Sequence, residues 1–234
     1  MEKDHWIREA ESFLTDRLGR GNYLCSHRDA LEYRIEHSRR VSAIGRQIAV
    51  KEGFDETEMT VACLLHDIAY SADFGENGWK DHGRQSAAMA RPFLRKLGLA
   101  DDRIDDICYG IAVHVDGNAD FEGELTPFAA TIGNADKIDR FGAFRIHQTL
   151  CLDGFLKKSL DGKKDYIRAR LSRLHGLGNV IMATYTAEEM WRERLAFYTA
   201  FFQKLSDQLE ISGVSYGCSG HEEDLEKELK RGTK

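Results

Sequence analysis

Apolar residues recur every three or four positions through most of the chain, which is the spacing of one face of an α-helix. Three such segments fill the first quarter of the sequence, from Trp6 to Leu18, from Leu31 to Ala49 and from Met59 to Leu65. Gly19 and Gly53 follow the first two segments, where a glycine readily ends a helix. We therefore expect three successive helices here, the third of them capped by the residues that precede Met59.

The same spacing continues beyond a polar, glycine-containing stretch, 71–81, that predicts a loop. A helix is expected to open at His82 and to be kinked or bounded at Pro92. The third helix is expected to start at Asp55 with Glu58. Later helices are expected at about 104–114, 128–139 and 186–205, and their expected starts are Asp101 or Asp102, Thr126 with Pro127, and Thr186 with Glu189. Shorter helices are expected at 143–150 and 166–174. No strand pattern of useful length appears, so the sequence predicts an all-α fold.

The helical pattern suggests three parts. Residues 1–27 are expected to form a docking helix, residues 28–210 a helical domain with a C-terminal extension, and residues 211–234 a flexible charged tail. A chain of 234 residues with 42% hydrophobic residues is long enough for a sizeable core in one domain.

Composition narrows the partners and the compartment. A net charge of −6 argues against a general nucleic-acid surface but leaves room for a local basic pocket that binds a phosphorylated small molecule. The five cysteines include no Cys-x-x-Cys pair, which suggests reduced thiols. No stretch approaches the roughly 20 apolar residues of a membrane span. We expect a cytoplasmic protein with no membrane contact; a homodimer stays open.

Polar residues interrupt the apolar faces at a few positions. His66 and Asp67 lie at the end of an apolar helix, where an ionised carboxylate is costly unless a hydrogen bond or a cation compensates it. A self-satisfied His–Asp pair would be the simplest explanation for this dipeptide alone. Four further residues, however, face inward or stand at helix ends: His37, His82, His114 and Asp136.

Singly, each of these residues is more often a hydrogen-bonded core or surface side chain than a metal ligand. Jointly, one core would have to satisfy six polar side chains without an ion, which favours a metal site. Mixed imidazole and carboxylate ligands suit Mn²⁺, Fe²⁺, Zn²⁺ or Co²⁺, and the lack of ligating cysteines argues against a closed structural zinc site.

In order and context these residues resemble the HD superfamily of metal-dependent phosphohydrolases, over roughly Tyr33 to Leu150 and more loosely to Leu209. The closest resemblance is to small stand-alone bacterial HD hydrolases, some of which are similar to nucleotide pyrophosphohydrolases. The matching motifs are Glu36-His37-Ser38-Arg39-Arg40-Val41, Leu64-Leu65-His66-Asp67-Ile68 and Asn134-Ala135-Asp136-Lys137-Ile138-Asp139.

The resemblance implies an HD-domain helical bundle that binds one or two divalent ions. The first ion would be held by His37, His66, Asp67 and Asp136, and His82 and His114 match positions that hold a second ion in binuclear members. We expect Mn²⁺ or Fe²⁺, with Zn²⁺, Co²⁺, Mg²⁺ and Ni²⁺ as alternatives.

The implied reaction is hydrolysis of a nucleotide or another small phosphorylated compound by metal-activated water. Lys80, Lys137 and Arg140 are the candidate phosphate-binding residues, although Lys80 is at least as well explained as solvated surface charge. Asp73 or Glu76 could position the water or act as general acid beside Asp67, and Asp139 is expected to orient a metal ligand or Lys137. Two alternatives stay open: a di-iron oxygenase of the HD type and a non-enzymatic ligand-binding domain.

Overall fold

The computed structural model describes residues 2–72 and 78–214. Within these ranges the chain forms α-helices and short 3-10 turns without any strand, which confirms the predicted all-α fold. The elements are α1 (Glu2–Gly19), η1 (Leu24–Ser26), α2 (Arg28–Glu52), α3 (Glu56–Leu65), η2 (Ile68–Ser71), α4 (Gly78–Leu97), α5 (Asp101–Val113), α6 (Pro127–Asp139), α7 (Ala143–Leu152), η3 (Phe155–Lys157), α8 (Leu160–His175) and α9 (Tyr185–Ser212).

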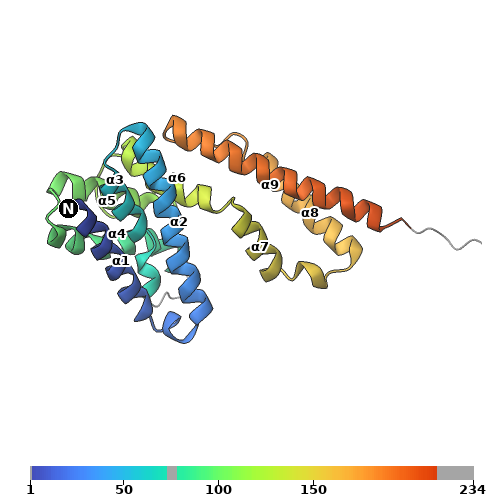
Figure 1. Ribbon diagram of the computed structural model, residues 1–234, viewed down its shortest axis with the longest axis horizontal. Coiled ribbons are helices and arrows are strands. Elements are labelled where there is room, and N and C mark those ends of the chain that lie inside the picture. The colour runs from blue at the N-terminus through green and yellow to red at the C-terminus, as the bar shows by residue number, and fades with distance from the viewer. Residues whose placement is uncertain (1, 73–77, 215–234) are drawn as a thin grey trace, which may run out of the picture.

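Helix α3 lies at the centre of the main body (Figure 1). Every residue from Met59 to Leu65 is buried, so this helix presents no polar stripe to solvent. Helices that are apolar on all sides belong in a protein interior. Helices α1, α2, α5 and α6 pack around it, and the polar pair His66-Asp67 follows directly at its end.

Several helix ends are fixed by the residues that the sequence indicated. The Asp55 carboxylate accepts hydrogen bonds from the backbone N–H groups of Thr57 and Glu58, at 2.9 and 3.0 Å, and so caps α3. The Thr126 hydroxyl caps α6 in the same way. Gly53, with φ of 75°, ends α2 in a left-handed conformation that costs a glycine little.

Two predicted caps were wrong. The N-cap of α5 is Ala100, and Asp101 and Asp102 instead occupy the first turn, where carboxylates interact favourably with the helix dipole. The cap of α9 is Thr184 rather than Thr186, so this helix starts two residues earlier. At α9 the sequence offered two threonines two residues apart with the same capping chemistry, whereas Ala100 has no side-chain acceptor and is the N-cap of α5 by backbone geometry alone.

Helix α4 also differs from the prediction. It begins at Gly78 rather than at His82, and it continues through Pro92 to Leu97. Pro92 has no N–H and so cannot donate a hydrogen bond to the carbonyl oxygen of Ala88, but the helix continues for five residues beyond it. Residues 73–77, which belong to the predicted loop, lie outside the described residues.

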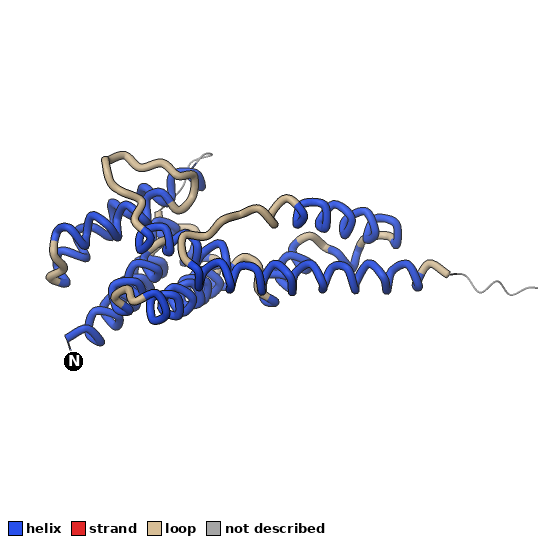
Figure 2. The backbone as a smooth tube through the Cα atoms, turned by 90° about the horizontal axis from the view of Figure 1, so that it is seen from above, coloured by secondary structure: helices blue, strands red, loops and turns tan. Residues whose placement is uncertain are grey.

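The described residues form two hydrophobic cores. The main core joins α1 to α6 and includes Trp191 of α9, whereas the second core is built by α7, η3, α8 and the later part of α9. Figures 1 and 2 show α8 and α9 side by side, extending away from the main body. Helix α1 buries Ala10, Leu14 and Leu18 completely in the main core. The division at residues 27 and 210 stays a prediction.

None of the described helices combines the length and the apolar character that crossing a bilayer requires.

Candidate metal centre

Five helices bring the predicted ligands to one place in the main body. Each of the six side chains is at most 5% exposed. They come from α2 (His37), the end of α3 (His66 and Asp67), α4 (His82), the end of α5 (His114) and α6 (Asp136). Residues spread over a hundred positions of the sequence therefore share one buried cluster.

One half of the cluster lies between α2, α3 and α6. His37 Nε2 is 3.2 Å from Asp136 Oδ1 and 3.5 Å from Asp67 Oδ2. His66 Nε2 is 3.6 Å from Asp67 Oδ2 and 3.9 Å from Asp136 Oδ1. Two donors bound to one ion at about 2.1 Å are about 3.0–3.4 Å apart, so these spacings are close to those of a shared coordination sphere.

The other half of the cluster uses the second oxygen of the same carboxylate. Asp67 Oδ1 is 3.2 Å from His82 Nε2 and 3.5 Å from His114 Nε2. The two imidazole nitrogens are themselves 3.2 Å apart. Asp67 thus lies between two groups of donors, which is the arrangement needed for either one or two ions.

Close helix packing places His82 against His114. Gly83 follows His82, and a Cβ atom at this glycine would lie 2.6 Å from the carbonyl oxygen of Ala112. That separation is too short for any side chain, so α4 and α5 can approach this closely only with glycine here. The contact is two residues from His114 and therefore sets the distance between the two rings.

The backbone fixes which ring nitrogen faces the cluster. His66 Nδ1 lies 2.7 Å from the carbonyl oxygen of Cys63, and His114 Nδ1 lies 2.7 Å from that of Ile111. A carbonyl only accepts, so each Nδ1 carries the hydrogen, and in a neutral ring Nε2 then holds a lone pair. Both lone pairs face Asp67, as metal-binding imidazoles require.

Two buried atoms of the cluster lack hydrogen bonds among the described residues. These are His66 Nε2 and Asp67 Oδ1. Leaving buried polar atoms unsatisfied is costly, and a lone pair beside a carboxylate oxygen adds repulsion. A divalent cation would bond both atoms at once, so the residues present fit such an ion.

Electrostatics separates the two histidines of the first half. Burial lowers the pKa of His37, but hydrogen bonds from its ring to Asp136 and Asp139 outweigh burial and raise the pKa to about 9. Burial dominates at His66 and lowers its pKa to about 4. Burial also opposes ionisation of Asp67, yet the surrounding histidines hold the pKa of this carboxyl well below its usual range. The carboxylate is therefore ionised at neutral pH.

Asp139 orients His37, as the sequence suggested. Its Oδ2 accepts a hydrogen bond from His37 Nδ1 at 2.8 Å. Its Oδ1 accepts one from Arg40 Nε at 2.9 Å, which fixes the carboxylate in turn. These hydrogen bonds turn His37 Nε2 toward Asp67 and Asp136, and they fix the tautomer of the neutral ring.

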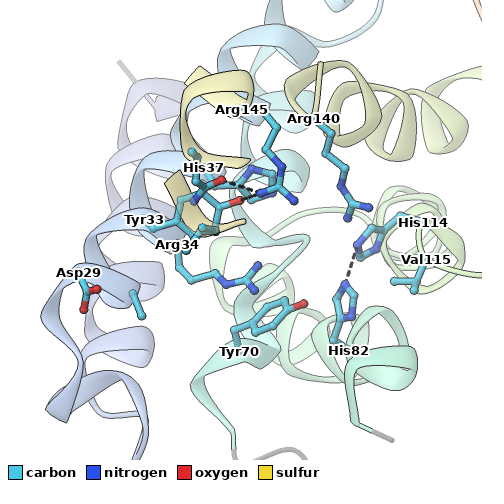
Figure 3. A pocket seen from close by; sticks show the side chains of 13 residues that line it. Asp29, Tyr33, Arg34, His37, Tyr70, His82, His114, Val115, Arg140 and Arg145 are labelled. Atoms are coloured by element: carbon cyan, nitrogen blue, oxygen red, sulfur yellow. Dashed lines mark hydrogen bonds between the residues drawn. The ribbon is translucent and has the colours of Figure 1, made fainter. Parts of the chain in front are cut away.

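A cavity of about 540 Å³ opens beside the cluster. His37, His82 and His114 form part of its wall, so the metal centre is reached from this side (Figure 3). Its other polar walls include three arginines, Arg34, Arg140 and Arg145, together with Tyr33, Tyr70 and Gln148.

The three arginines are held by different partners. Arg34 Nη1 donates to Asp67 Oδ2 at 3.1 Å, and Arg140 Nη2 is 2.9 Å from Asp136 Oδ2. Arg145 Nη1 donates to the hydroxyl of Tyr33 at 3.0 Å. Each guanidinium keeps further N–H groups beyond these contacts, and its fork geometry suits phosphate oxygens.

The structure distributes the predicted substrate and catalytic residues unevenly. Arg140 lines the cavity, whereas Lys137 is exposed on α6 and is not among the residues that form the cavity wall. Asp73 and Glu76, and the side chain of Lys80, lie outside the described residues. Their roles stay predictions.

Sequence reasoning missed Arg34 and Arg145. Arg34 precedes His37 by three residues on α2, so helical spacing alone could have placed both on one face. Arg145 carried no such signal, because it reaches the cavity only through the placement of α7 over the main body.

Comparisons with known proteins agree on the fold. A family model described as HD domain matches residues 34–140. A predicted HD superfamily hydrolase from an uncultured Thermotogales bacterium is similar over 86% of this chain and 91% of its own, with 20% identity and a TM-score of 0.58. Bacillus subtilis YpgQ, in complex with ADP, is similar over 89% of this chain and 97% of its own, with 17% identity and a TM-score of 0.60. No curated protein matches the chain in sequence.

Proposed function

Because residues 34–140 of this chain form an HD domain, we propose that the protein is a metal-dependent phosphohydrolase that acts on a small phosphorylated compound, in particular a nucleotide. One observation carries this proposal. Three histidines of a buried cluster that fits a divalent cation line the same cavity as three arginines. A cation beside guanidinium groups is the combination that binds phosphate and activates water against it.

The described residues supply two donor groups for ions. His37, His66, Asp67 and Asp136 would hold the first ion, and Asp67, His82 and His114 would hold the second. Mn²⁺ or Fe²⁺ suits these mixed ligands best. A bound divalent ion lowers the pKa of coordinated water toward about 7 and stabilises charge on phosphoryl oxygens.

The arginines would bind and orient the phosphate. Arg34 and Arg140 each contact a ligand carboxylate, so their remaining N–H groups lie next to the metal centre. Arg145 comes from α7 and would contact the substrate from the side of the extended arm. Asp73 or Glu76 is proposed to position the water or to act as general acid.

A nucleotide is the substrate class we favour. The similar fold of YpgQ is known with ADP bound, which supports a nucleotide for this chain as well. The cavity of about 540 Å³ falls within the roughly 300–1,000 Å³ typical of small-molecule sites.

The test is a screen of phosphate release with the full chain. The protein is depleted of metal, reloaded with Mn²⁺, and assayed with nucleotides and with simple phosphorylated compounds. We expect Mn²⁺-dependent phosphate release that is lost in Asp67→Ala and retained in Asp153→Ala, an exposed carboxylate near the end of α7.

The screen also separates the alternatives. Two irons per chain with oxygen consumption, and no phosphate release, would instead indicate a di-iron oxygenase. Folded protein that binds ligand but shows neither activity would indicate a binding domain.

A further inference from the structure

A second cavity, of about 620 Å³, adjoins the first one. Its wall is formed by Tyr23, Leu24, Ala30, Tyr33, Arg34, Tyr70 and Ala72. Four of these residues, Ala30, Tyr33, Arg34 and Tyr70, also line the cavity at the metal centre. The two cavities are therefore neighbours across a common wall.

Arg34 is the central residue of the common wall. Its guanidinium lies 3.3 Å from the ring centroid of Tyr70 and 5.5 Å from that of Tyr33. The same guanidinium contacts Asp67 at 3.1 Å. Figure 3 shows Tyr33, Arg34 and Tyr70 on the same side of the first cavity. A ligand that passes this wall would leave the charged centre and enter an aromatic environment.

The two cavities differ in chemistry. The first holds imidazoles and three guanidinium groups, whereas the described wall of the second consists of three tyrosines, three aliphatic residues and the single guanidinium of Arg34. That guanidinium contacts Asp67 and is assigned to the phosphate at the metal centre, so the second cavity has no separate cation for another phosphate among its described wall residues. Tyrosine rings and an arginine plane instead favour stacking with a flat aromatic group.

We infer that the second cavity binds the heteroaromatic base of a nucleoside phosphate whose phosphate groups lie at the metal centre. This inference rests on the proposed phosphohydrolase function and names the part of the substrate that gives affinity. The described wall carries no carboxylate or carboxamide side chain that would read the edge of a base. The aromatic wall would recognise the base by stacking, which is open to purines and pyrimidines alike because every base has a π-face.

One part of the wall of the second cavity, which the first cavity does not share, comes from the N-terminal segment of this chain. Tyr23 and Leu24 belong to the η1 region, which precedes the residues matched by the HD domain model. Leu24 is buried, whereas Tyr23 is 60% exposed. The Tyr23 ring stacks on His27 at 4.0 Å with an angle of 13° between the planes, so the ring is held in place before a ligand arrives.

The test uses a matched pair of non-hydrolysable ligands with the Mn²⁺-loaded full chain. Isothermal titration calorimetry compares α,β-methylene-ADP with methylenediphosphonate, which has the same phosphonate groups but no nucleoside. We expect the nucleotide analogue to bind at least tenfold more tightly, since stacking on aromatic side chains gives gains of about this size.

Variants locate the difference in the second cavity. Tyr23→Ala should weaken binding of the nucleotide analogue by about tenfold and leave the diphosphonate unchanged, whereas Tyr23→Phe keeps the ring and both affinities. Ala72→Trp, which fills only the second cavity, should act like Tyr23→Ala. Tyr185→Ala removes a similarly exposed tyrosine on α9 and should change neither affinity.

Equal affinities of wild-type protein for the two ligands, or equal losses for both ligands in Tyr23→Ala and Ala72→Trp, would overturn the inference. Failure of the proposed function looks different. In that case no phosphorylated compound releases phosphate with Mn²⁺. If this inference alone fails, Mn²⁺-dependent phosphate release remains, and inorganic tripolyphosphate is cleaved as efficiently as nucleotides.

Discussion

Asp139→Asn tests how much a residue that contacts a proposed metal ligand, but is not a ligand itself, contributes to metal affinity. Asp139 accepts hydrogen bonds from His37 Nδ1 at 2.8 Å and from Arg40 Nε at 2.9 Å. An asparagine of the same size has one acceptor oxygen and one NH₂ group. It can satisfy His37 or Arg40 but not both, and it removes the negative charge that both neighbours contact.

The expected loss follows from these contacts. A hydrogen bond to a charged group contributes about 1.5–3 kcal/mol. If the loss falls on His37, the ring is held less firmly and the affinity for the ion drops by about 10- to 100-fold, the range for partners of metal-binding histidines. At 1.4 kcal/mol per tenfold, that range is about 1.4–2.8 kcal/mol, which agrees with the contribution of the single bond.

The assay is a titration of the metal-depleted protein with Mn²⁺, monitored by isothermal titration calorimetry at a temperature well below the melting temperature. We expect weaker binding with unchanged stoichiometry, because Asp139 is not itself a proposed ligand. Asp153→Asn is the matched control, since this carboxylate accepts a hydrogen bond from the Tyr166 hydroxyl and is not among the residues that line the cavity at the centre. If the folded Asp139→Asn protein binds Mn²⁺ with an affinity within twofold of wild type, Asp139 does not hold His37 in place for metal binding.

Three further predictions concern packing, capping and pH. Gly83→Ala places a Cβ 2.6 Å from the carbonyl oxygen of Ala112, so α4 must move away from α5. Urea denaturation should show that the free energy of unfolding falls by about 1–3 kcal/mol. An unchanged urea midpoint would contradict the close packing of the two helices. Thr126→Ala removes the cap of α6 and the hydrogen bond to Asp106, and thermal unfolding should show a loss of about 1–2 kcal/mol, against no measurable change if the cap contributes nothing. The ligands bind metal only when deprotonated, and the pKa of His37, raised to about 9, keeps this ring protonated below that pH. The apparent Mn²⁺ affinity should therefore rise from pH 6 to pH 9. Titrations that show no pH dependence of this affinity would contradict a protonated His37 that must lose its proton to bind the ion.

Most of the fold was predictable because the signal is local. Helical periodicity and single residues such as Gly53 and Thr126 fix where α2 ends and where α6 begins. The cap at Thr184 was missed because Thr186 offers the same chemistry, and the cap at Ala100 was missed because alanine carries no capping side chain and only the backbone geometry marks it.

The cluster that forms the candidate metal centre could be located in the sequence for a different reason. An imidazole or carboxylate on an apolar face is costly, so positions such as His66 and Asp67 stand out in the sequence itself. The cavity wall carried no comparable signal, since arginine and tyrosine are ordinary surface residues. Arg145 and Tyr23 acquire a role only when α7 and η1 are placed against α2.

We propose that six side chains from five helices converge on one or two bound cations, with Asp67 between the two groups of donors. Crystals of the full chain grown with Mn²⁺, with anomalous scattering recorded for manganese, test this claim most directly. The account predicts an anomalous peak at bonding distance, about 2.0–2.3 Å, from His66 Nε2 and an Asp67 carboxylate oxygen. A fully ordered cluster with no peak, in protein that has been exposed to saturating Mn²⁺, would contradict it.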